Sequence, residues 1–374
     1  MKKVLLTATV QSHIVQFHKP LIELLHEYGY EVHVAARNNL AEKNGLKLDF
    51  VDRVYDIPFS RSPKSLDNLK AYSHIKRILK NEYYDVVHCN TPMAGIVTRL
   101  ATRKTRKRGT RVVYTAHGFH FYKGAPIKNW ILFYPIERIM AKYCDTLITI
   151  TKEDYRLAKN HFPTNVEHIH GVGVYTDRYH PVPEEKQLLL RQMEGLKDSD
   201  FVILCTGELN KNKNQKTLIL VAQKLRKETS DFVILLAGNG PTECSLKKQI
   251  KELGVEKHVR MLGYRTDLEK VTPSVDLVVS CSHREGLPLN IIEAMLCKKP
   301  VVVSSNRGHK ELVKKGFNGF IFKADDIEGY TEAIKELVEN KAERNSYGEN
   351  GYRKAKRYTA DFVKKELKAI YRLG

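Results

Sequence analysis

Short apolar runs alternate with segments of helical periodicity along most of this 374-residue chain. Residues 4–8 predict a buried strand, and residues 14–28 predict a helix that ends at Gly29. Strands that are apolar along their length and are separated by helices are typical of a parallel sheet covered on both faces. The other elements predicted in the first half span residues 31–36, 66–81, 85–88, 111–116, 129–142 and 146–150.

A polar, proline-bearing stretch at residues 179–186 interrupts the alternation, and we predict a linker there. Each series of elements predicts one doubly wound α/β domain, the first over residues 1–180 and the second over 187–355. Open sheets of this kind bind ligands outside the carboxyl ends of their strands, so two of them facing a cleft suit a donor and an acceptor. The second series spans residues 201–205, 217–227, 232–237, 246–253, 259–262, 277–280, 289–296 and 301–304, and the chain after residue 327 is predicted to be mainly helical.

The composition is that of a folded protein without a membrane span. Hydrophobic residues make up 42% of the chain, and no apolar run approaches the roughly 20 residues that cross a bilayer. The apolar run after Lys2 and Lys3 is short and lacks a signal-peptide cleavage site, so we expect a buried first strand and a cytoplasmic protein. None of the six cysteines forms a C-x-x-C pair, which argues against a structural zinc site or a redox dithiol.

The formal net charge is +20, and the excess is spread over both halves of the chain. Its densest cluster lies at residues 99–111 and includes the run RKTRKR. Nucleic acid, an anionic membrane surface and phosphorylated ligands are the three partners that such a cluster attracts. A helix end and loop exposed to water is the alternative that needs no partner.

Two glutamates, Glu285 and Glu293, stand eight positions apart in the segment 280–295. Glu285 lies in a loop after an apolar run, and Glu293 lies in a predicted helix whose first turn suits Pro288, because no backbone donor is needed there. The unpaired N–H groups at a helix start attract an anionic ligand. Glu285 is then placed to reach the polar end of that ligand and Glu293 to accept from hydroxyls beside phosphates, which are both features of a sugar nucleotide. Two solvated glutamates are the alternative.

With a glycine and a proline between the glutamates and Ala294-Met295 after them, this segment resembles the signature of the retaining glycosyltransferases of family 4, which have the two-domain GT-B fold. The resemblance implies that Glu285 contacts the donor sugar and Glu293 the ribose of the nucleotide. It also implies that the last helix, residues 356–374, crosses back to the first domain. The residues of this segment assigned to donor binding are Glu285, Gly286, Leu287, Pro288, Leu289, Asn290 and Glu293.

The loop that opens the second domain resembles the phosphate-binding loop of the family, Gly-Arg-Leu followed by a lysine. Gly207 and Lys213 match this pattern, whereas Glu208 occupies the position of the arginine. The resemblance implies that Lys213 neutralises the diphosphate leaving group. The arginine that shares this role in the family is absent here. Lys211 or a basic group from elsewhere is the candidate replacement, and a lysine-asparagine surface turn is the alternative.

Two further loops of the second domain resemble donor-binding loops. Gly238-Asn239-Gly240 follows a predicted strand, where glycines let the backbone approach a ligand closely, and the family has the donor diphosphate nearby. Gly263-Tyr264-Arg265 resembles the loop whose main chain holds the nucleobase. An ordinary tight turn and an exposed surface aromatic are the respective alternatives.

In the first domain, His117 follows a predicted buried strand and precedes a glycine, so it is placed to reach the cleft. The family has a histidine here that approaches the donor sugar and the reaction centre; a structural histidine is the alternative. We assign Phe119 and His120 to acceptor binding, and packing is the alternative for His120. Many family members have a Gly-Gly pair after the first strand, whereas this chain has the loop 9–13, in which His13 is the candidate acceptor contact.

Aromatic and basic side chains gather at residues 119–123 and 130–134. Such a surface is expected to lie at a membrane interface or to take a prenyl chain, and packing of an amphipathic helix is the alternative. The runs HGFHF and EGLPLN resemble the subgroup that adds N-acetylhexosamines to polyprenyl-diphosphate-linked saccharides. This finer resemblance implies a UDP-sugar donor, a lipid-linked saccharide acceptor, and a role in capsule or exopolysaccharide synthesis at the inner face of the plasma membrane.

The predicted reaction proceeds with retention of anomeric configuration and needs neither a cofactor nor a metal, since no Asp-x-Asp pair stands at a suitable strand end. Lys213 and the helix start near Asn290 stabilise the departing phosphate, and Glu285 stabilises the cationic sugar ring. No residue is a clear covalent nucleophile, which favours front-face attack with a phosphate oxygen taking the acceptor's proton.

Three other functions compete with this one. A sugar-nucleotide epimerase of the same two-domain shape would turn over a UDP-sugar without an acceptor. A basic nucleic-acid-binding protein is disfavoured because the charge is spread and no nucleic-acid motif is present. A nicotinamide dehydrogenase is disfavoured because the first strand leads into Thr-Ala-Thr-Val-Gln-Ser and not into a glycine fingerprint.

Overall fold

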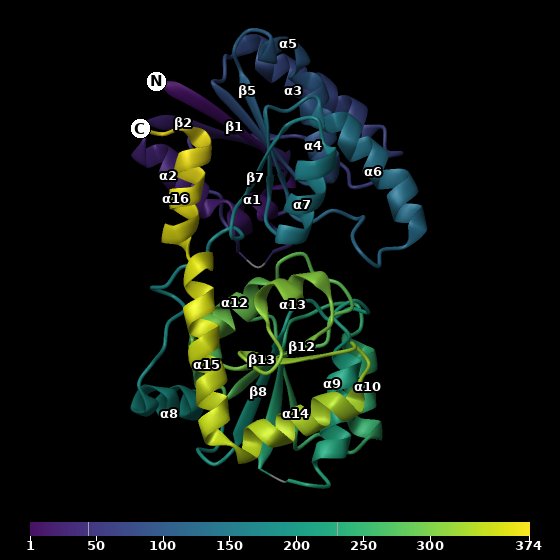
Figure 1. Cartoon of the computed structure of the whole chain (residues 1–374), viewed down its shortest axis with the longest axis vertical. Helices are drawn as coiled ribbons and strands as arrows, with labels where there is room; N and C mark the ends of the chain where they lie inside the picture. Colours follow the sequence, from purple (N-terminus) through teal and green to yellow (C-terminus); the bar gives the residue numbers. More distant parts are fainter. Residues whose placement is uncertain (44, 230) are drawn as a thin grey trace. The chain divides into compact units, whose positions relative to one another are not determined.

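The computed structural model describes residues 1–43, 45–229 and 231–374, which form two compact units (Figure 1). The first unit comprises Met1–Gly173 together with Ala360–Gly374, and the second comprises Val174–Thr359. The first break therefore lies a few residues before position 180, the boundary that the sequence predicts. The last helix begins at Ala360 rather than at residue 356.

The first unit contains a parallel sheet of seven strands in the order β3-β2-β1-β4-β5-β6-β7. The central strands β1 and β4 are buried almost throughout, as expected for a sheet with both faces covered. Because the chain leaves β1 toward β2 and later returns to its other side at β4, the topological switch point lies between β1 and β4. The strands are β1 (Lys2–Val10), β2 (Tyr30–Arg37), β3 (Arg53–Asp56), β4 (Val86–Asn90), β5 (Arg111–Ala116), β6 (Thr146–Thr149) and β7 (Asn165–His168).

Helices cover both faces of this sheet, with α2 and α16 side by side on one face and α3, α4 and α6 over the other (Figure 1). The amphipathic periodicity of α2, α3 and α16 gives each of them one apolar face that packs inward. The helices of the first unit are α1 (Gln11–Phe17), α2 (Lys19–Glu27), α3 (Asp67–Asn81), α4 (Pro92–Ala101), α5 (Arg103–Arg106), α6 (Ile127–Ala141), α7 (Lys152–His161) and α16 (Ala360–Tyr371).

The last helix, α16, is held in the first unit by polar contacts as well as by packing. The hydroxyl of Tyr371 lies 2.6 Å from Nδ1 of the buried His88. Nη2 of Arg111 donates to the carbonyl oxygen of Ile370 over 2.7 Å. These contacts connect α16 to strands β4 and β5, although more than 250 residues separate the partners in the sequence.

The second unit contains a parallel sheet of six strands in the order β10-β9-β8-β11-β12-β13. Its switch point lies between β8 and β11, because the chain proceeds from β8 to β9 on one side and returns to β11 on the other. The strands are β8 (Phe201–Thr206), β9 (Phe232–Ala237), β10 (Val259–Gly263), β11 (Leu277–Ser280), β12 (Val301–Ser304) and β13 (Gly319–Phe322).

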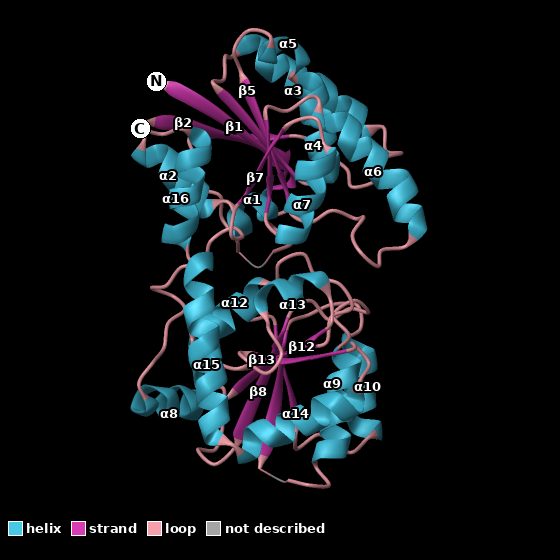
Figure 2. Cartoon of the chain, in the orientation of Figure 1, coloured by secondary structure: helices cyan, strands magenta, loops and turns pink. Residues whose placement is uncertain are grey.

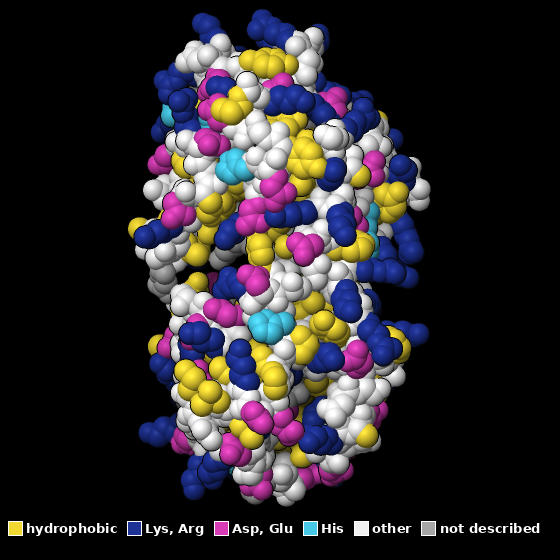
Figure 3. Space-filling model, turned by 90° about the vertical axis from the view of Figure 1, so that its left-hand side faces the viewer, with side chains coloured by type: hydrophobic (Ala, Val, Ile, Leu, Met, Phe, Trp, Pro, Cys, Tyr) yellow, Lys and Arg dark blue, Asp and Glu magenta, His cyan; other side chains and the backbone are white. Residues whose placement is uncertain are grey.

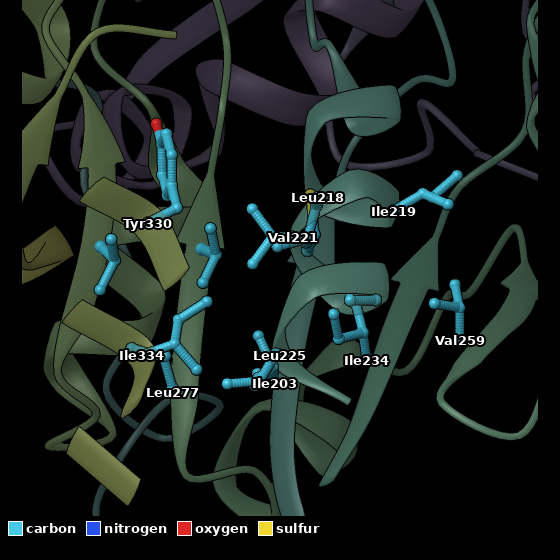
Figure 4. Close-up of a cluster of buried hydrophobic side chains, with 14 of the residues drawn as sticks. Ile203, Leu218, Ile219, Val221, Leu225, Ile234, Val259, Leu277, Tyr330 and Ile334 are labelled. Carbon is cyan, nitrogen blue, oxygen red and sulfur yellow. The ribbon is translucent and has the colours of Figure 1, made fainter. Parts of the chain in front are cut away.

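Helices also cover both faces of the second sheet (Figure 2). Ile203 of β8, Leu218 of α9 and Ile334 of α14 meet in one buried cluster (Figure 4). Burying an aliphatic side chain of this size stabilises a fold by about 1.5–3 kcal/mol. The helices of the second unit are α8 (Glu184–Met193), α9 (Gln215–Leu225), α10 (Glu243–Glu252), α11 (Leu268–Ser274), α12 (Leu289–Leu296), α13 (Arg307–Leu312), α14 (Ile327–Glu339) and α15 (Lys341–Ala355), with a short 3-10 helix at Lys356–Tyr358.

The structure differs from the sequence prediction at the start of the chain. β1 continues to Val10 and α1 begins at Gln11, so the loop predicted at residues 9–13 is a strand end followed directly by a helix. The single helix predicted at 14–28 is divided into α1 and α2 at His18. Pro20 explains this division, because it has no N–H to continue the first helix but fits the first turn of the second.

Other differences concern elements that the sequence analysis missed or placed elsewhere, among them the apolar edge strand β13. Helix α8 begins at Glu184, inside the predicted linker. Strands β3 and β7 were not predicted, because both are short, largely polar strands at the two edges of the sheet and lack the apolar run that identifies a buried strand. No helix in the described part of the chain is both long enough and apolar enough to cross a bilayer.

Candidate active site

The carboxyl ends of β8 and β11 lie at the switch point of the second sheet, where open α/β sheets bind their ligands. The loop after β8 contains Lys213, and the loop after β11 contains Glu285. Nζ of Lys213 donates to Oε1 of Glu285 over 2.7 Å, and both side chains are largely buried. The structure thus brings together two predicted site residues that stand far apart in the sequence.

Backbone contacts hold the two loops together beside this ion pair. The N–H of His283 donates to the carbonyl oxygen of Asn212 over 2.8 Å, and the side-chain amide of Asn212 donates to the carbonyl oxygen of Arg284 over 3.0 Å. Oδ1 of Asn210 accepts from the N–H of Lys213 over 2.9 Å. The positions of Lys213 and Glu285 are therefore fixed by their own loops and do not depend on the ion pair alone.

The glycines of the second unit let its loops pack tightly on one another. A Cβ on Gly238 would lie 2.0 Å from the carbonyl oxygen of Gly207, and a Cβ on Gly240 would lie 2.4 Å from that of Leu209. Both glycines also have positive φ angles, of 150° and 156°. The space beside their α-carbons is occupied by the neighbouring loop, so close loop packing is the first reason for glycine at these two positions.

The helix start predicted near Asn290 is observed in α12, with one correction. Pro288 is the N-cap residue and precedes the helix, so it does not lie in the first turn. Its carbonyl oxygen accepts from the N–H of Ile292, and the N–H groups of Leu289 and Asn290 have no helical partner. Gly286 and Leu287 are partly buried just before this helix start.

Glu293 projects from α12 and is half-buried. The net pKa of its carboxyl group is raised to about 7, chiefly by burial. The nearby Arg178 guanidinium opposes this increase, and the carboxylate of Glu269 adds to it. Arg178 also donates to Glu269 over 2.9 Å. The pKa of Glu293 therefore lies within the range where small changes in pH alter its charge.

Arg178 was missed as a site residue. It lies in the segment that the sequence analysis assigned to the first domain, but the structure includes it in the second unit. No local motif surrounds it, so only the fold shows that it lies close to Glu293.

The two side chains of the predicted base-binding loop have different surroundings: Tyr264 is exposed, and Arg265 is paired with carboxylates. Tyr264, at the carboxyl end of β10, is 41% exposed. The guanidinium of Arg265 makes paired hydrogen bonds to Glu194 and to Asp267 at 2.7–2.9 Å, and these bonds raise its pKa. The charge of Arg265 is neutralised within the protein, and its observed role is to hold the loop. The carbonyl oxygen of Gly263 accepts from Gly238 over 2.7 Å.

Two other predicted donor residues are at the protein surface. Glu208 is exposed, and its carboxylate accepts from the side chain of Asn210 over 3.0 Å. Asn239 is also exposed, and its carbonyl oxygen accepts from the N–H of Leu209 over 2.8 Å. Neither side chain has the burial or the charge partner that distinguishes Lys213 and Glu285.

His309, on α13 after β12, is a second residue that the sequence analysis missed. It is fully buried, Nδ1 lies 2.8 Å from the carbonyl oxygen of Ser304, and Nε2 has no hydrogen-bond partner among the described residues. Its pKa is lowered to about 4, chiefly by burial. The charges of Glu285 and Lys213 shift this pKa in opposite directions, which shows that the ring lies near their ion pair. A Cβ on the preceding Gly308 would lie 2.4 Å from the carbonyl oxygen of Gly286.

In the first unit, His117 follows β5 and lies close to His13 of α1. The ring centroids of the two histidines are 4.5 Å apart, and Nε2 of His117 lies 3.2 Å from Oδ1 of Asn90. Burial lowers the pKa of His117 to about 4, so its ring is neutral near pH 7. The structure therefore brings together two histidines that the sequence analysis assigned to the reaction centre and to the acceptor.

The other predicted acceptor residues differ in their surroundings. Phe119 is buried in the core of the first unit and stacks on Phe121 at 4.8 Å between ring centroids, so packing accounts for Phe119. His120 is partly buried, and its ring lies 4.8 Å from that of Phe133. Of this pair, only His120 retains some exposure to solvent.

Thr91 marks the switch point of the first sheet with a strained backbone. Its φ of 63° and ψ of 149° form a combination that residues other than glycine rarely adopt, at a cost of about 1–3 kcal/mol. Oγ1 of Thr91 accepts from the N–H of Thr9 over 3.0 Å, and it lies 2.7 Å from Oγ1 of Thr9. Conformations of this kind concentrate at functional sites.

Comparison with known proteins relates both halves of the chain to glycosyltransferases. Models of glycosyl transferases group 1 and of glycosyltransferase family 4 match residues 187–354 and 19–178. EpsD of Bacillus subtilis (strain 168), whose name describes a glycosyltransferase, is 39% identical over 99% of this chain and 96% of its own length. The UDP-Gal:alpha-D-GlcNAc-diphosphoundecaprenol alpha-1,3-galactosyltransferase of Escherichia coli is 28% identical over 81% of this chain and 80% of its own.

The fold also matches solved structures. The crystal structure of Anabaena Alr3699/HepE in complex with UDP and glucose covers 100% of both chains with a TM-score of 0.81 and 21% identity. Both sheets of this chain are parallel and doubly wound, as in the GT-B fold. The chain is a GT-B protein and belongs to the family 4 glycosyltransferases.

Proposed function

We propose that this glycosyltransferase moves a hexose from a UDP-sugar to a saccharide carried on a polyprenyl diphosphate, with retention of anomeric configuration. The observation that carries the proposal is the ion pair between Lys213 and Glu285 at the switch point of the second sheet. It supplies one cation for a diphosphate and one carboxylate for a sugar at the same edge of the sheet. Glu293 lies one turn into the adjacent α12, where it suits the ribose hydroxyls.

In the proposed reaction, the bond between the sugar C1 and the diphosphate oxygen breaks while a bond from C1 to the acceptor oxygen forms on the same face. The proton of the acceptor hydroxyl passes to an oxygen of the departing diphosphate. Lys213 and the N–H groups at the start of α12 stabilise the charge that grows on that diphosphate. Glu285 stabilises the positive charge that grows on the sugar ring. Since Lys213 supplies the positive charge, the proposed transfer does not require a metal ion.

The proposed donor is a UDP-N-acetylhexosamine. Support for the uridine nucleotide comes from the names of two similar proteins, one of which uses UDP-Gal while the other was crystallised with UDP. Support for a lipid-linked acceptor comes from the same E. coli relative, whose named acceptor is a diphosphoundecaprenol-linked sugar. Capsule or exopolysaccharide assembly is the process in which such a transfer takes part.

We also propose that the protein works at the cytoplasmic surface of the membrane through α6. This helix exposes large aliphatic side chains next to basic ones, a combination that suits the interface of an anionic bilayer. The RKTRKR run that forms and follows α5 adds positive charge in the same unit. The exposed aliphatic residues of α6 are Ile127, Ile131, Leu132, Ile136 and Ile139.

On the face that Figure 3 shows, the charge pattern differs from that of a nucleic-acid-binding surface. Lys and Arg side chains are spread over the visible face and are mixed with Asp and Glu, without a continuous basic stripe (Figure 3). A nucleic-acid-binding surface concentrates its basic residues along one face.

A thermal-shift panel of nucleotide sugars, followed by transfer of a radiolabelled sugar to short polyprenyl-diphosphate saccharides, tests the proposal. We expect UDP-N-acetylhexosamine to stabilise the protein more than GDP- or ADP-sugars do, and label to appear in the lipid-linked product. Turnover of the UDP-sugar without an acceptor would identify an epimerase instead. Absence of stabilisation by every nucleotide sugar would contradict the proposal.

A further inference from the structure

Three histidine side chains of the first unit converge beside the switch point of its sheet. His13 lies on α1, His18 lies between α1 and α2, and His117 follows β5. One ring nitrogen of each lies within 4.8 Å of the others. We propose that these three imidazoles form a binding site for one divalent transition-metal ion of the zinc class.

The spacing of the three rings suits a tetrahedral ion. The ring centroids are 4.5 Å apart for His13 and His117, and 5.3 Å apart for each pair that includes His18. A tetrahedral ion about 2.1 Å from each nitrogen holds the nitrogens about 3.4 Å apart and the ring centres about 5 Å apart. The ring centres already have this spacing. The nitrogens close the remaining gap by rotation about χ2, which is a soft torsion in histidine.

Two of the three rings have a nitrogen that nothing in the described protein satisfies. Nε2 of His13 and Nε2 of His18 are buried and have no hydrogen-bond partner among the described residues. Leaving a buried polar atom unsatisfied costs about 1–3 kcal/mol. One ion bound between these rings would satisfy both nitrogens at once.

The third ring is oriented by a partner outside the cluster. Asn90 donates its side-chain N–H to the carbonyl oxygen of Thr7 over 3.4 Å, which turns its Oδ1 toward Nε2 of His117, 3.2 Å away. Nε2 of His117 therefore carries the hydrogen, and Nδ1 keeps the lone pair. Histidines that ligate metals usually donate their other ring N–H to such an oxygen.

The three imidazole rings are in the neutral form that metal ligands require. Burial lowers the pKa of His117 to about 4 and lowers those of His13 and His18 well below the ordinary value, so all three rings are neutral near pH 7. Neutral imidazole is the form that ligates zinc. The nearby His88 is not part of the set, because Tyr371 and Thr115 occupy both of its nitrogens.

The donor set also indicates which ions would bind. Three imidazoles suit Zn²⁺, Co²⁺, Ni²⁺ or Cu²⁺, whereas Mg²⁺ and Ca²⁺ require oxygen ligands. Three protein ligands leave the fourth position of a tetrahedral ion for water. The site lies in the first unit and shares no residue with the Lys213–Glu285 pair, but it includes His117 and His13, which the sequence analysis assigned to the reaction centre and to the acceptor.

Titration of the full chain, prepared without a polyhistidine tag, tests the site. By calorimetry we expect one Zn²⁺ per chain, and by visible absorption we expect Co²⁺ to show the intense ligand-field bands of a tetrahedral site; excess Mg²⁺ should displace neither. His18→Gln should weaken Zn²⁺ binding by at least about 100-fold, and Asn90→Ala by about 10–100-fold. His161→Ala, at the exposed end of α7, is the matched control and should bind as the native chain does.

X-ray absorption of the zinc-loaded native chain measures the ligands around the ion and needs no variant. It should find three nitrogen neighbours at about 2.0–2.1 Å from the zinc. This measurement decides the question if His18→Gln does not fold, which circular dichroism will reveal. Failure of the folded native chain to bind Zn²⁺ would overturn the proposal. Equal Zn²⁺ affinity of the native chain and a folded His18→Gln variant would overturn it too.

Discussion

Lys213 and Glu285 form an ion pair, 2.7 Å between Nζ and Oε1, that joins the loops after β8 and β11. Without a ligand, the carboxylate of Glu285 is the counter-ion of the lysine. In the proposed reaction the donor diphosphate competes for the same ammonium group and leaves Glu285 to interact with the hexose. Binding of the diphosphate to Lys213 and release of Glu285 toward the hexose therefore depend on the same ion pair.

Replacing Glu285 by glutamine should separate binding from chemistry. The amide keeps the shape of the side chain but cannot stabilise a cationic sugar ring, so we expect kcat to fall by about 10²–10³-fold. UDP-sugar affinity should be retained, because Lys213 loses the carboxylate that competes with the diphosphate. Radiolabel transfer and calorimetry measure the two effects, and Glu256→Gln, at an exposed position, is the control. Transfer by Glu285→Gln at the native rate would contradict the assigned role.

Lys213 and Lys211 lie in the same loop, but only Lys213 reaches Glu285. Lys213→Met should lower kcat by about 10²-fold or more, because the departing diphosphate loses its cation. Lys211 is exposed, and Lys211→Met should change the rate less than about threefold. Single-turnover transfer assays compare the two variants. Equal losses would show that Lys211 replaces the arginine that Glu208 displaces.

Nucleotide affinity should depend on the ionisation of Glu293, whose pKa burial raises to about 7. Ribose hydroxyls donate to the ionised carboxylate, so affinity should be constant above pH 7 and fall about tenfold per pH unit below it. Calorimetry with a UDP-sugar is the measurement, because the terminal phosphate of UDP itself titrates near pH 6. Glu293→Gln should bind more weakly and show no pH dependence in this range. Identical profiles for the two proteins would argue against the ribose contact.

The stability of the first unit should depend strongly on Arg99. This side chain is fully buried, donates to Glu137 over 3.0 Å, and stacks on the ring of Tyr114 at 3.9 Å. Arg99→Ala leaves the Glu137 carboxylate buried without its cation and should cost about 3–5 kcal/mol. Urea denaturation measures the loss, and Arg108→Ala, at an exposed position, should change stability by less than about 0.5 kcal/mol.

Membrane association should depend on the exposed face of α6. Replacing Ile131 and Ile136 by glutamate adds charge to an apolar surface and should reduce binding to anionic lipid vesicles by at least about tenfold. Leu189→Glu changes an exposed leucine on α8 of the second unit and should leave binding unchanged. Vesicle co-sedimentation compares the three proteins. If all three bind vesicles equally, α6 is not the membrane surface.

Local signals made most of the fold predictable. The strands β9, β11 and β12 and the helix α12 lie at the predicted residues or within them. The strands are apolar runs between turn residues, and the apolar residues of α12 recur at helical spacing. Polar edge strands such as β7 carry no such signal and depend on a neighbouring strand for their hydrogen bonds. The break at His18 was overlooked because the helical periodicity continues across it, although Pro20 marks the start of α2.

The candidate site was predictable only where a motif is contiguous. Glu285 and Glu293 are eight positions apart, so the sequence itself indicates that they belong together. The approach of His13 to His117, about a hundred positions later, depends on β1, β4 and β5 lying side by side in the sheet. Likewise, nothing in the residues around Arg178 indicates its proximity to Glu293.

A crystal structure of the chain with an unreactive UDP-hexose analogue tests the central claim most directly. We predict that the diphosphate lies between the loops after β8 and β11, within hydrogen-bond distance of Lys213 Nζ, and that a hexose hydroxyl donates to Glu285. A nucleotide bound elsewhere, or a bound donor with both side chains turned away from it, would contradict the account.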